Sequence, residues 1–255
     1  MDKRRDYPIL EFDVDRQAMI EPHKLLKPID IPTRAVACFF QDVIQTLVKD
    51  HQAQIRYTLR SELGAHPVYE ITHLGERVTV FHPGVGAPLA AGIFEEVIAL
   101  GVRSCVACGG AGVLDAAIQV GEVIVPYAAI RDEGVSYHYL PPAREVAANP
   151  AVVATIQQIL ESKTIPYLLT KTWTTDAIYR ETQARIQLRK EEGCKTVEME
   201  AAAFFAIAQF RNVSFGQLLY GGDDLGSEEW AHRNWHKHEV RERLFWLAVE
   251  SCLAL

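Results

Sequence analysis

Acidic side chains and glycines gather in a few short segments of this sequence, and such residues can build a site for a small polar ligand. Glu198 and Glu200 stand immediately before an alanine-rich stretch, and Asp223 follows a pair of glycines. Glycine-rich turns occur at 83–88 (PGVGAP) and 108–112 (CGGAG). Carboxyl groups bind hydroxyls and transfer protons, while glycines let backbone N–H groups approach a ligand closely. Together they predict a site that binds hydroxyls and protonates a leaving group.

Each of these features also has a purely structural explanation. Glu198 and Glu200 would lie at the start of a helix, where the helix dipole favours negative charge. Asp223 and Asp224 could cap a helix that we expect from about Ser227. The glycines could simply form tight strand-to-helix turns. The functional interpretation therefore depends on the combination of these residues at the ends of successive strands.

The common catalytic and metal-binding signatures do not occur in the sequence. It contains no P-loop, dinucleotide-binding, zinc-protease or nucleophile-elbow motif. Cys105 and Cys108 form a C-x-x-C, but they fall in an expected strand, where residues three apart point to opposite faces. His236 and His238 are two apart on an expected helix, a spacing that separates their side chains. We therefore expect buried thiols, no metal site and no organic cofactor.

Alternating strand-like and helix-like segments must position these residues. Apolar runs predict buried strands, and the segments on either side of Gly75 predict a hairpin. Strands are expected at 35–40, 68–74, 77–82, 104–108, 122–130, 166–173 and 214–222. Helices are expected after residue 40, at 89–100, 150–162, 180–192 and 200–210, and from about 227. This alternation predicts an α/β fold, a single domain with a mixed central β-sheet flanked by helices. Ligands of such folds bind at the carboxyl ends of the strands.

Composition narrows the class of protein further. With 255 residues, 49% of them hydrophobic and 23% charged, the chain has an ordinary globular composition, which excludes a disordered protein or a coiled coil. Its net charge of −7 and the lack of a Lys/Arg block predict no nucleic-acid binding. The longest apolar run, 201–208, is too short to cross a membrane, and MDKRRDYPIL has no apolar signal segment. Five cysteines fit reduced thiols, so we expect a cytoplasmic protein.

The first 33 residues differ from the rest of the chain. They carry four prolines and little periodicity, which opposes regular structure. We predict an extended N-terminal arm over residues 1–33, lying on the body or on a neighbouring subunit, with a loosely ordered tail as the alternative. The catalytic domain is expected to span residues 34–255.

VEMEAAAFF (197–205) resembles the ribose-binding signature of the nucleoside phosphorylase-I family, which includes purine nucleoside and uridine phosphorylases and methylthioadenosine/S-adenosylhomocysteine nucleosidases. VTVFHPGVGAP, CVACGGAGVLDAAIQVGEVIVP, IRDEGVSYHYLP and GGDDL are similar to further segments of this family, in the same order. The resemblance covers roughly residues 35–250. It implies the family's fold, cleavage of nucleosides, and a homo-oligomer (dimer or hexamer).

The resemblance also implies roles for individual residues. Glu200 would hydrogen-bond the sugar hydroxyls, Met199 would pack beneath the ribose, and Glu198 would shape the pocket. Asp223 would protonate N7 of a departing purine. The base would be contacted by Gly112, Ile178 and Tyr179. If one residue is inserted, Gln183 and Arg185 also resemble the Gln-x-Arg pair with which uridine phosphorylases bind uracil. Asp223 thus favours a purine, whereas the similarity to the Gln-x-Arg pair favours a pyrimidine.

The phosphate site departs from the family pattern. CFFQD (38–42) replaces a Pro-Gly-Asp-Pro-like turn, Ala107 stands where phosphorylases have an arginine, and Gly110 replaces a Ser or Thr. The family's nucleosidases also lack the arginine and carry an acidic residue near the position of Asp42 that helps activate water. Gly84, Gly110 and Asp42 are the residues expected at the phosphate or water. Arg34, Arg60 and Arg131 are candidates to replace the missing arginine, within the subunit or across a subunit boundary.

We therefore predict an enzyme of nucleoside metabolism that cleaves a nucleoside, with a purine favoured, using phosphate as its co-substrate. Two alternatives remain open: hydrolysis by water, and a nucleoside-binding protein that has lost catalysis.

Overall fold

β5 (Ser104–Val113) is the strand around which the central sheet is organised. It pairs in parallel with β1 (Arg34–Cys38) and with β10 (Ser214–Asp224). Its last residues, Gly112 and Val113, pair antiparallel with β9 (Cys194–Glu198). The computed structural model describes residues 4–50 and 52–255. Because β5 is buried along most of its length, its apolar first half supplies the core and its glycine-rich second half reaches the ligand end of the sheet.

Within these described ranges the sheet has ten strands and mixed pairing, which confirms the predicted fold class. β10, β6 (Val123–Asp132), β8 (Tyr167–Thr175), β9 and β5 form a closed ring, because β10 pairs with both β6 and β5. From β1 the sheet continues outward through three more strands, β4 (Glu76–Phe81), β3 (Gly64–His73) and β2 (Gln54–Ser61). The short strand β7 (Glu145–Ala147) pairs with β6. The expected hairpin at Gly75 joins β3 to β4.

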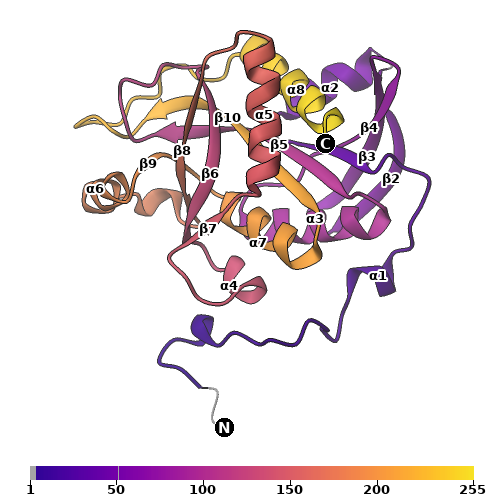
Figure 1. Cartoon of the computed structure of the whole chain (residues 1–255), viewed down its shortest axis with the longest axis horizontal. Helices are drawn as coiled ribbons and strands as arrows, with labels where there is room; N and C mark the ends of the chain where they lie inside the picture. Colours follow the sequence, from indigo (N-terminus) through magenta and orange to yellow (C-terminus); the bar gives the residue numbers. More distant parts are fainter. Residues whose placement is uncertain (1–3, 51) are drawn as a thin grey trace.

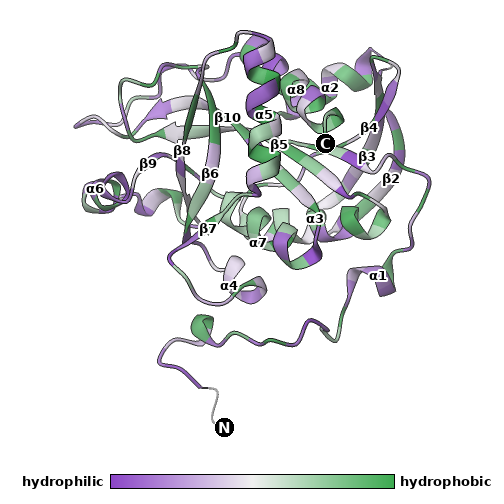
Figure 2. Cartoon of the chain, viewed as in Figure 1, coloured by the Kyte–Doolittle hydropathy of each residue, from purple (hydrophilic) through white to green (hydrophobic). Residues whose placement is uncertain are grey.

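Two groups of helices cover the sheet (Figure 1). One group contains α2 (Gln41–Lys49), α5 (Pro150–Ser162) and α8 (His238–Leu253). The other contains α3 (Ala87–Leu100), α4 (Ser136–Tyr139) and α7 (Ala201–Arg211), and α6 (Gln183–Glu191) lies beside β9. The hydropathy colouring shows apolar strands between more polar outer helix surfaces (Figure 2). Phe204 of α7 packs between Phe94 of α3 and Phe215 of β10, with ring centroids 5.3 and 5.0 Å away. This apolar contact fixes α7, and hence the residues that precede it.

Two sequence-based expectations about the elements were wrong. The last helix begins at His238 instead of near residue 227, so His236 precedes it and Asp223 and Asp224 end strand β10. The strands β2, β7 and β9 were not expected. Most residues of β2 are exposed and its apolar pattern is weak, while β7 and β9 have only three and five residues. The expectation for the cysteines is confirmed: all five are free and buried.

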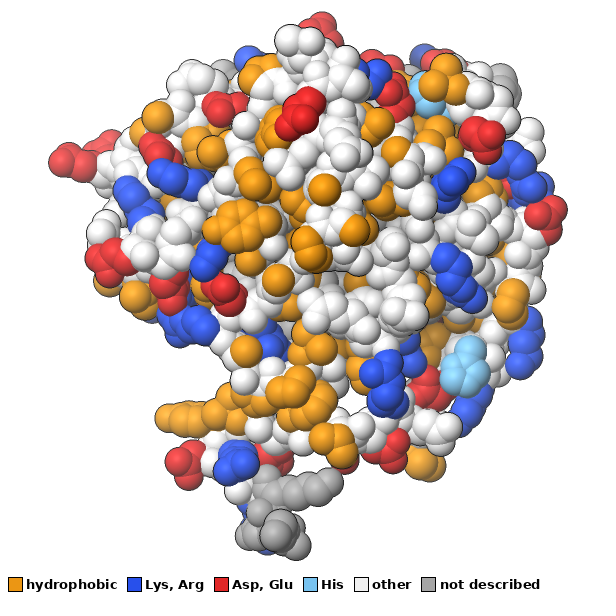
Figure 3. Space-filling view, viewed as in Figure 1, with side chains coloured by type: hydrophobic (Ala, Val, Ile, Leu, Met, Phe, Trp, Pro, Cys, Tyr) orange, Lys and Arg blue, Asp and Glu red, His pale blue; other side chains and the backbone are white. Residues whose placement is uncertain are grey.

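The described part of the N-terminal segment, residues 4–33, runs along the α3 and α4 side of the domain (Figure 1). It contains a short 3-10 helix (Pro8–Leu10) and α1 (Pro22–Leu25). Arg211 of α7 donates to Glu21 of this segment at 3.2 Å and to Glu95 of α3 at 2.7 Å. Figure 3 shows apolar side chains on the surface at the lower edge of the molecule, where the segment lies. Tyr7, Val14, Met19 and Ile20 of the segment are each more than half exposed. A buried carboxylate therefore ties an otherwise exposed segment to the domain.

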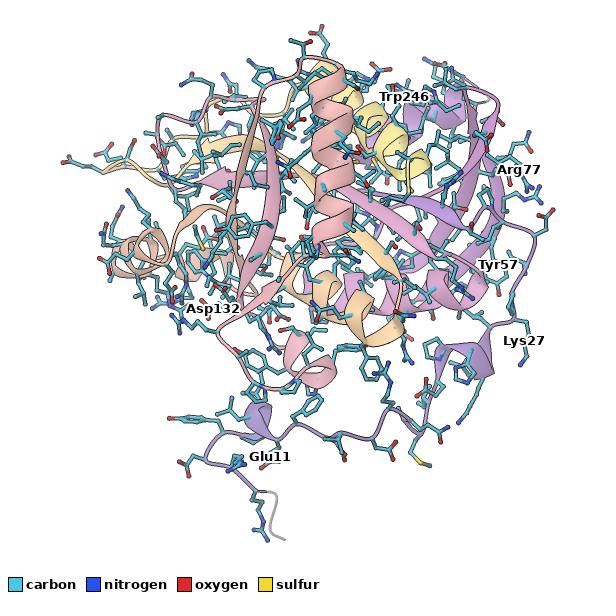
Figure 4. All side chains as sticks on the ribbon, viewed as in Figure 1. Glu11, Lys27, Tyr57, Arg77, Asp132 and Trp246 are labelled. Carbon is cyan, nitrogen blue, oxygen red and sulfur yellow. The ribbon has the colours of Figure 1, made fainter. Side chains whose placement is uncertain are left out.

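The end of this segment is also attached to the sheet. Arg77, at the start of β4, donates to both carboxylate oxygens of Glu70 on β3, at 2.9 and 2.8 Å, and to Asp30 at 3.3 Å (Figure 4).

Among residues 4–50 and 52–255, no helix is long and apolar enough to cross a membrane.

Candidate active site

A cavity of about 730 Å³ opens where several strands of the sheet end. Five parts of the chain form most of its walls. They are the segment after β1 (residues 39–40), the last part of β5 (109–112), the end of β9 and the turn after it (197–200), β10 (217, 219 and 223) and the segment after β8 (178–179 and 181). Residues 225, 230 and 235, from the loop after β10, and Arg241 of α8 also line the cavity. The cavity therefore lies where an α/β fold is expected to bind its ligand.

Glu198 and Glu200 lie side by side on one wall, and both are more than 90% buried. Glu198 Oε2 accepts the backbone N–H groups of Glu200 (2.7 Å) and Ala201 (2.6 Å), and Oε1 accepts the hydroxyl of Thr174 (2.6 Å). Glu200 Oε1 accepts the backbone N–H of Gly86 at 2.5 Å. Both residues line the cavity, but the carboxylate of Glu198 accepts three hydrogen bonds that hold the turn in shape, whereas Glu200 accepts the N–H of Gly86.

The glycine turn before α3 supplies that N–H group. Gly86 has φ of 88°, and Gly84 has φ of 83° with Leu89 so close that a Cβ would lie 2.4 Å from it. Side chains are strongly disfavoured in this left-handed conformation. Gly84 does not line the cavity. Its contribution is to shape the turn that brings Gly86 to Glu200.

Burial raises the pKa of both Glu198 and Glu200, and the nearby charge of Glu198 raises that of Glu200 further. Two buried carboxylates this close together repel each other. A ligand that donates hydroxyl groups or develops positive charge beside Glu200 relieves that cost. This electrostatic setting suits a sugar that becomes cationic during bond cleavage.

Asp223 and Asp224 are adjacent in β10 but have different environments, since neighbouring strand residues point to opposite faces. Asp223 lines the cavity, and its Oδ2 accepts the indole N–H of Trp230 at 2.7 Å. Asp224 is buried and accepts the N–H of Gly226 (2.7 Å) and the hydroxyl of Ser227 (2.6 Å). Asp223 therefore faces the cavity, whereas Asp224 closes the turn.

Gly112 is closely packed beside Asp223. A Cβ at this position would lie 2.5 Å from Leu225, 3.1 Å from Val197 and 3.5 Å from Asp223 Oδ1. The absence of a side chain thus lets Leu225 and Val197 pack against this wall of the cavity. Ile178 and Tyr179, which were expected at the base, also line the cavity, as does Met199.

Glu181 is a cavity residue that the sequence analysis missed. It follows the 3-10 turn Ile178–Arg180, and burial, together with the nearby charge of Asp223, raises its pKa to about 7. Glu181 lies between the expected strand end and the Gln183–Arg185 pair and belongs to no motif, so the local sequence carries no signal for it. The cavity thus has two acidic groups on this side, Asp223 and Glu181.

Gln183 and Arg185 are placed outside the cavity, on α6. The amide of Gln183 donates to the carbonyl oxygen of Glu228 at 3.4 Å. Arg185 lies 3.6 Å from the carboxylate of Asp132, a residue at the end of β6 that Figure 4 labels. In this structure, neither side chain is in position to read a base.

The residues expected at the phosphate or water are only partly brought together. Gly110 lines the cavity, and a Cβ there would lie 3.2 Å from Trp235. Asp42, in the first turn of α2, is not a lining residue but bonds to one, because Arg241 donates to it at 3.1 Å. Arg131 is buried elsewhere, where its guanidinium donates to Ser136 and to the carbonyl oxygens of residues 140 and 141.

A family model described as the phosphorylase superfamily matches residues 33–249. The chain belongs to the phosphorylase superfamily. Within it, the guanosine phosphorylase of Halorubrum lacusprofundi is 26% identical over 173 residues, or 64% of this chain and 70% of that protein. This confirms the family resemblance drawn from the sequence motifs.

Solved structures show the same superfamily fold. The uridine phosphorylase of Vibrio fischeri has a TM-score of 0.73 and 22% identity, and the match covers 94% of this chain and 100% of that one. The AMP nucleosidase of Bacteroides thetaiotaomicron has a TM-score of 0.71 and 20% identity, and the match covers 89% and 90%. At these identities the likeness establishes the fold alone. Proteins with this fold include both phosphorylases and a nucleosidase.

Across the described ranges of this superfamily member, no group of three or more His, Cys, Asp or Glu residues is arranged to hold a metal ion. The chemistry that the cavity offers comes from its carboxyl groups, its backbone N–H groups and one guanidinium.

Proposed function

We propose that the chain cleaves the N-glycosidic bond of a purine nucleoside with inorganic phosphate, giving the free base and a pentose 1-phosphate. The observation that carries this proposal is that Glu200 and Asp223 line one cavity, each held by a hydrogen bond from a neighbouring residue. The reaction needs groups of this kind for both the sugar and the base. It requires no metal or organic cofactor.

Glu200 is the group proposed to act on the sugar. Breaking the bond between C1′ and N9 leaves oxocarbenium character on the sugar, and a carboxylate held in a largely water-excluded wall stabilises that charge. Glu200 would accept hydrogen bonds from the sugar hydroxyls and bring C1′ to a fixed place. Glu198 supports this role by fixing the backbone of Glu200.

Asp223 and Glu181 are the groups proposed to act on the base. As the bond breaks, its electron pair moves to the purine, which becomes a better leaving group when N7 is protonated. Glu181, with a pKa of about 7, holds a proton on part of the molecules at neutral pH, next to Asp223. We propose that the acidic pair delivers this proton to N7, with Asp223 in contact with the base.

Phosphate completes the reaction. One phosphate oxygen bonds to C1′ as the bond from C1′ to N9 breaks, and the proton on N7 balances the charge of the departing base. A relative named guanosine phosphorylase supports phosphate as the acceptor and a purine as the base.

Hydrolysis is the second candidate, and a specific observation favours it. The lining residues include four carboxyl groups and one guanidinium, and that guanidinium already bonds to Asp42. A cavity with this charge balance admits water more readily than a phosphate dianion. Asp42 would then act as the carboxylate that orients the water.

The test is product analysis with purified protein and a panel of guanosine, inosine, adenosine and uridine, with and without phosphate. Free base is measured by chromatography, and pentose 1-phosphate by phosphorus NMR. Purine release that requires phosphate and yields pentose 1-phosphate is expected. Free pentose in both conditions would instead support hydrolysis. The variant Gln183→Ala, altered outside the cavity, should behave like the wild type.

A further inference from the structure

Arg241 is the one cation among the described residues that line the cavity. It lies in the first turn of α8, and its side chain is 16% exposed. The four carboxyl groups on the same walls make the rest of the cavity unfavourable for an anion. Any anionic part of a ligand is therefore drawn to this corner.

The guanidinium of Arg241 is held in place by groups from three other parts of the chain. Nε donates to the hydroxyl of Tyr220 at 3.3 Å, and Nη1 donates to Asp42 at 3.1 Å. The rings of Phe40 and Trp235 each have their centroid 5.5 Å from the guanidinium carbon. Contacts of this kind fix a long side chain before a ligand arrives, which lowers the entropic cost of binding.

Nε and Nη1 of Arg241 are therefore hydrogen-bonded, whereas Nη2 has no hydrogen-bond acceptor among the described residues. An arginine that offers a fixed N–H group within a partly enclosed cavity suits a phosphate oxygen. The same corner contains Gly110, where a Cβ would lie 3.2 Å from Trp235 and 3.4 Å from Tyr220. The absence of a side chain at Gly110 thus lets Trp235 and Tyr220, which both contact Arg241, pack closely against β5.

His238 adds a second potential donor near this corner. Its Nδ1 lies 3.0 Å from Asp42 Oδ2, while Arg241 binds Oδ1 of the same carboxylate. Asp42 therefore offsets the positive charge of Arg241 as long as no stronger anion is bound. A phosphate dianion carries more charge than a carboxylate and can compete for Arg241.

We propose that Arg241, with Asp42 as its exchangeable counter-ion, forms an anion subsite for a phosphate group within the cavity. The inference rests on the proposed function for its ligand. That group is either free inorganic phosphate, the attacking reagent, or a phosphate ester carried by the nucleoside itself. Both present the same oxygens to the guanidinium, and the experiment separates them.

The first measurement is direct binding of inorganic phosphate by calorimetry, which requires no turnover. Arg241→Gln should weaken phosphate binding at least tenfold. Arg241→Lys, which keeps the charge but loses the planar fork, should fall between Arg241→Gln and the wild type. Asp42→Asn removes the competing carboxylate and should strengthen phosphate binding. Arg243→Gln is the matched control, because Arg243 lies two residues further on α8 and donates to the carbonyl oxygen of Gly121, outside the cavity.

The second measurement identifies the source of the phosphate. Each variant is assayed with a nucleoside plus inorganic phosphate. Its binding of the matching nucleoside 5′-monophosphate is measured by calorimetry in phosphate-free buffer, where phosphorolysis has no acceptor. A rise in KM for inorganic phosphate in Arg241→Gln assigns the subsite to the co-substrate, and weaker binding of the monophosphate with an unchanged KM for inorganic phosphate assigns it to the ester. If Arg241→Gln folds normally and neither its binding of phosphate or of the monophosphate nor its KM for inorganic phosphate differs from the Arg243→Gln control, the inference is wrong. Failure of the wild type to cleave any nucleoside would contradict the proposed function, while phosphate binding would still test Arg241.

Discussion

The backbone N–H of Glu200 donates to the carboxylate of Glu198 at 2.7 Å, so one acidic residue fixes the position of the other. Both side chains are buried, yet they have different partners. Glu198 bonds to Glu200, Ala201 and Thr174, whereas Glu200 receives the N–H of Gly86 and faces the cavity. A division into a supporting and a ligand-facing carboxylate follows, and it can be tested by comparing substitutions at the two positions.

Glu198→Ala should mainly affect stability. It leaves two buried backbone N–H groups without their acceptor, and such losses cost roughly 1–3 kcal/mol of unfolding free energy each. Glu200→Ala removes the acceptor of one N–H group, that of Gly86, so it should lower the unfolding midpoint less than Glu198→Ala. It should lower kcat by about 10² to 10³, the effect typical of losing one group that stabilises transition-state charge. Thermal unfolding and steady-state kinetics on both variants check this. Equal stability losses in the two variants would contradict the division of roles.

Asp223→Asn should abolish turnover while leaving nucleoside binding nearly intact, because the amide cannot supply a proton to N7. The neighbouring substitution Asp224→Asn is the comparison. Asp224→Asn weakens the hydrogen bonds to Gly226 and Ser227, so its main effect should be a lower unfolding midpoint and not a loss of turnover. Binding by calorimetry and base release by chromatography distinguish the two. Normal turnover in Asp223→Asn would remove Asp223 from the mechanism.

The raised pKa of Glu181 predicts that kcat depends on pH near neutrality. Its pKa is raised to about 7, so the proton is present below that pH and is lost as pH rises through it. Wild-type kcat should therefore fall above about pH 7, and Glu181→Gln should lack this falling limb. The measurement is a pH–rate profile for both proteins. If kcat of Glu181→Gln falls above pH 7 as it does in the wild type, Glu181 is not the group responsible.

The same shift predicts an effect on stability. A carboxyl group whose pKa is raised from 4.5 to about 7 on folding contributes stability that is fully present below pH 4.5 and is lost as pH rises through 7. Glu181→Gln should therefore show a smaller fall in unfolding temperature across this interval than the wild type. Calorimetric scans from pH 4.5 to 8 would show this. Identical pH dependence in the two proteins would mean that Glu181 is not buried next to Asp223 in solution.

Gly112→Ala should lower activity by displacing Leu225 and so disturbing the cavity wall beside Asp223. Its Cβ would lie 2.5 Å from Leu225, so the cavity wall must move. Gly92→Ala is the matched control, because a Cβ at this exposed glycine of α3 would meet no atom within 4 Å and should add about 1 kcal/mol of stability through helix propensity. KM and kcat for both variants, with their unfolding midpoints, separate the two effects. An active Gly112→Ala enzyme would show that this wall does not contact the ligand.

Local sequence patterns predicted much of the fold. The hairpin at Gly75 and the helix that Gly101 ends were confirmed, since turn glycines and apolar spacing are local signals. The start of α8 was misplaced because aromatic packing, including Trp235 on Tyr220, holds residues 225–237 in an irregular loop despite their polar, helix-like pattern. In that case tertiary contacts overrode local preference.

The site was predictable where its residues belong to a recognisable motif. Glu198, Glu200 and Asp223 lie in such segments, and the structure places Glu200 and Asp223 on one cavity. Arg241 could not be found in this way, because its position depends on how α8 packs beside α2, almost 200 residues earlier in the chain. Among the arginines suggested from the sequence, Arg34, Arg60 and Arg131 do not line the cavity.

The most direct test of the account is base release from guanosine and inosine in the presence of phosphate, measured for the wild type, Glu200→Ala and Asp223→Asn. The account predicts release by the wild type and a loss of about 10² or more in both variants. No release from any nucleoside by the folded wild-type protein, or full activity in both variants, would contradict the assignment of this cavity as a site of N-glycosidic bond cleavage.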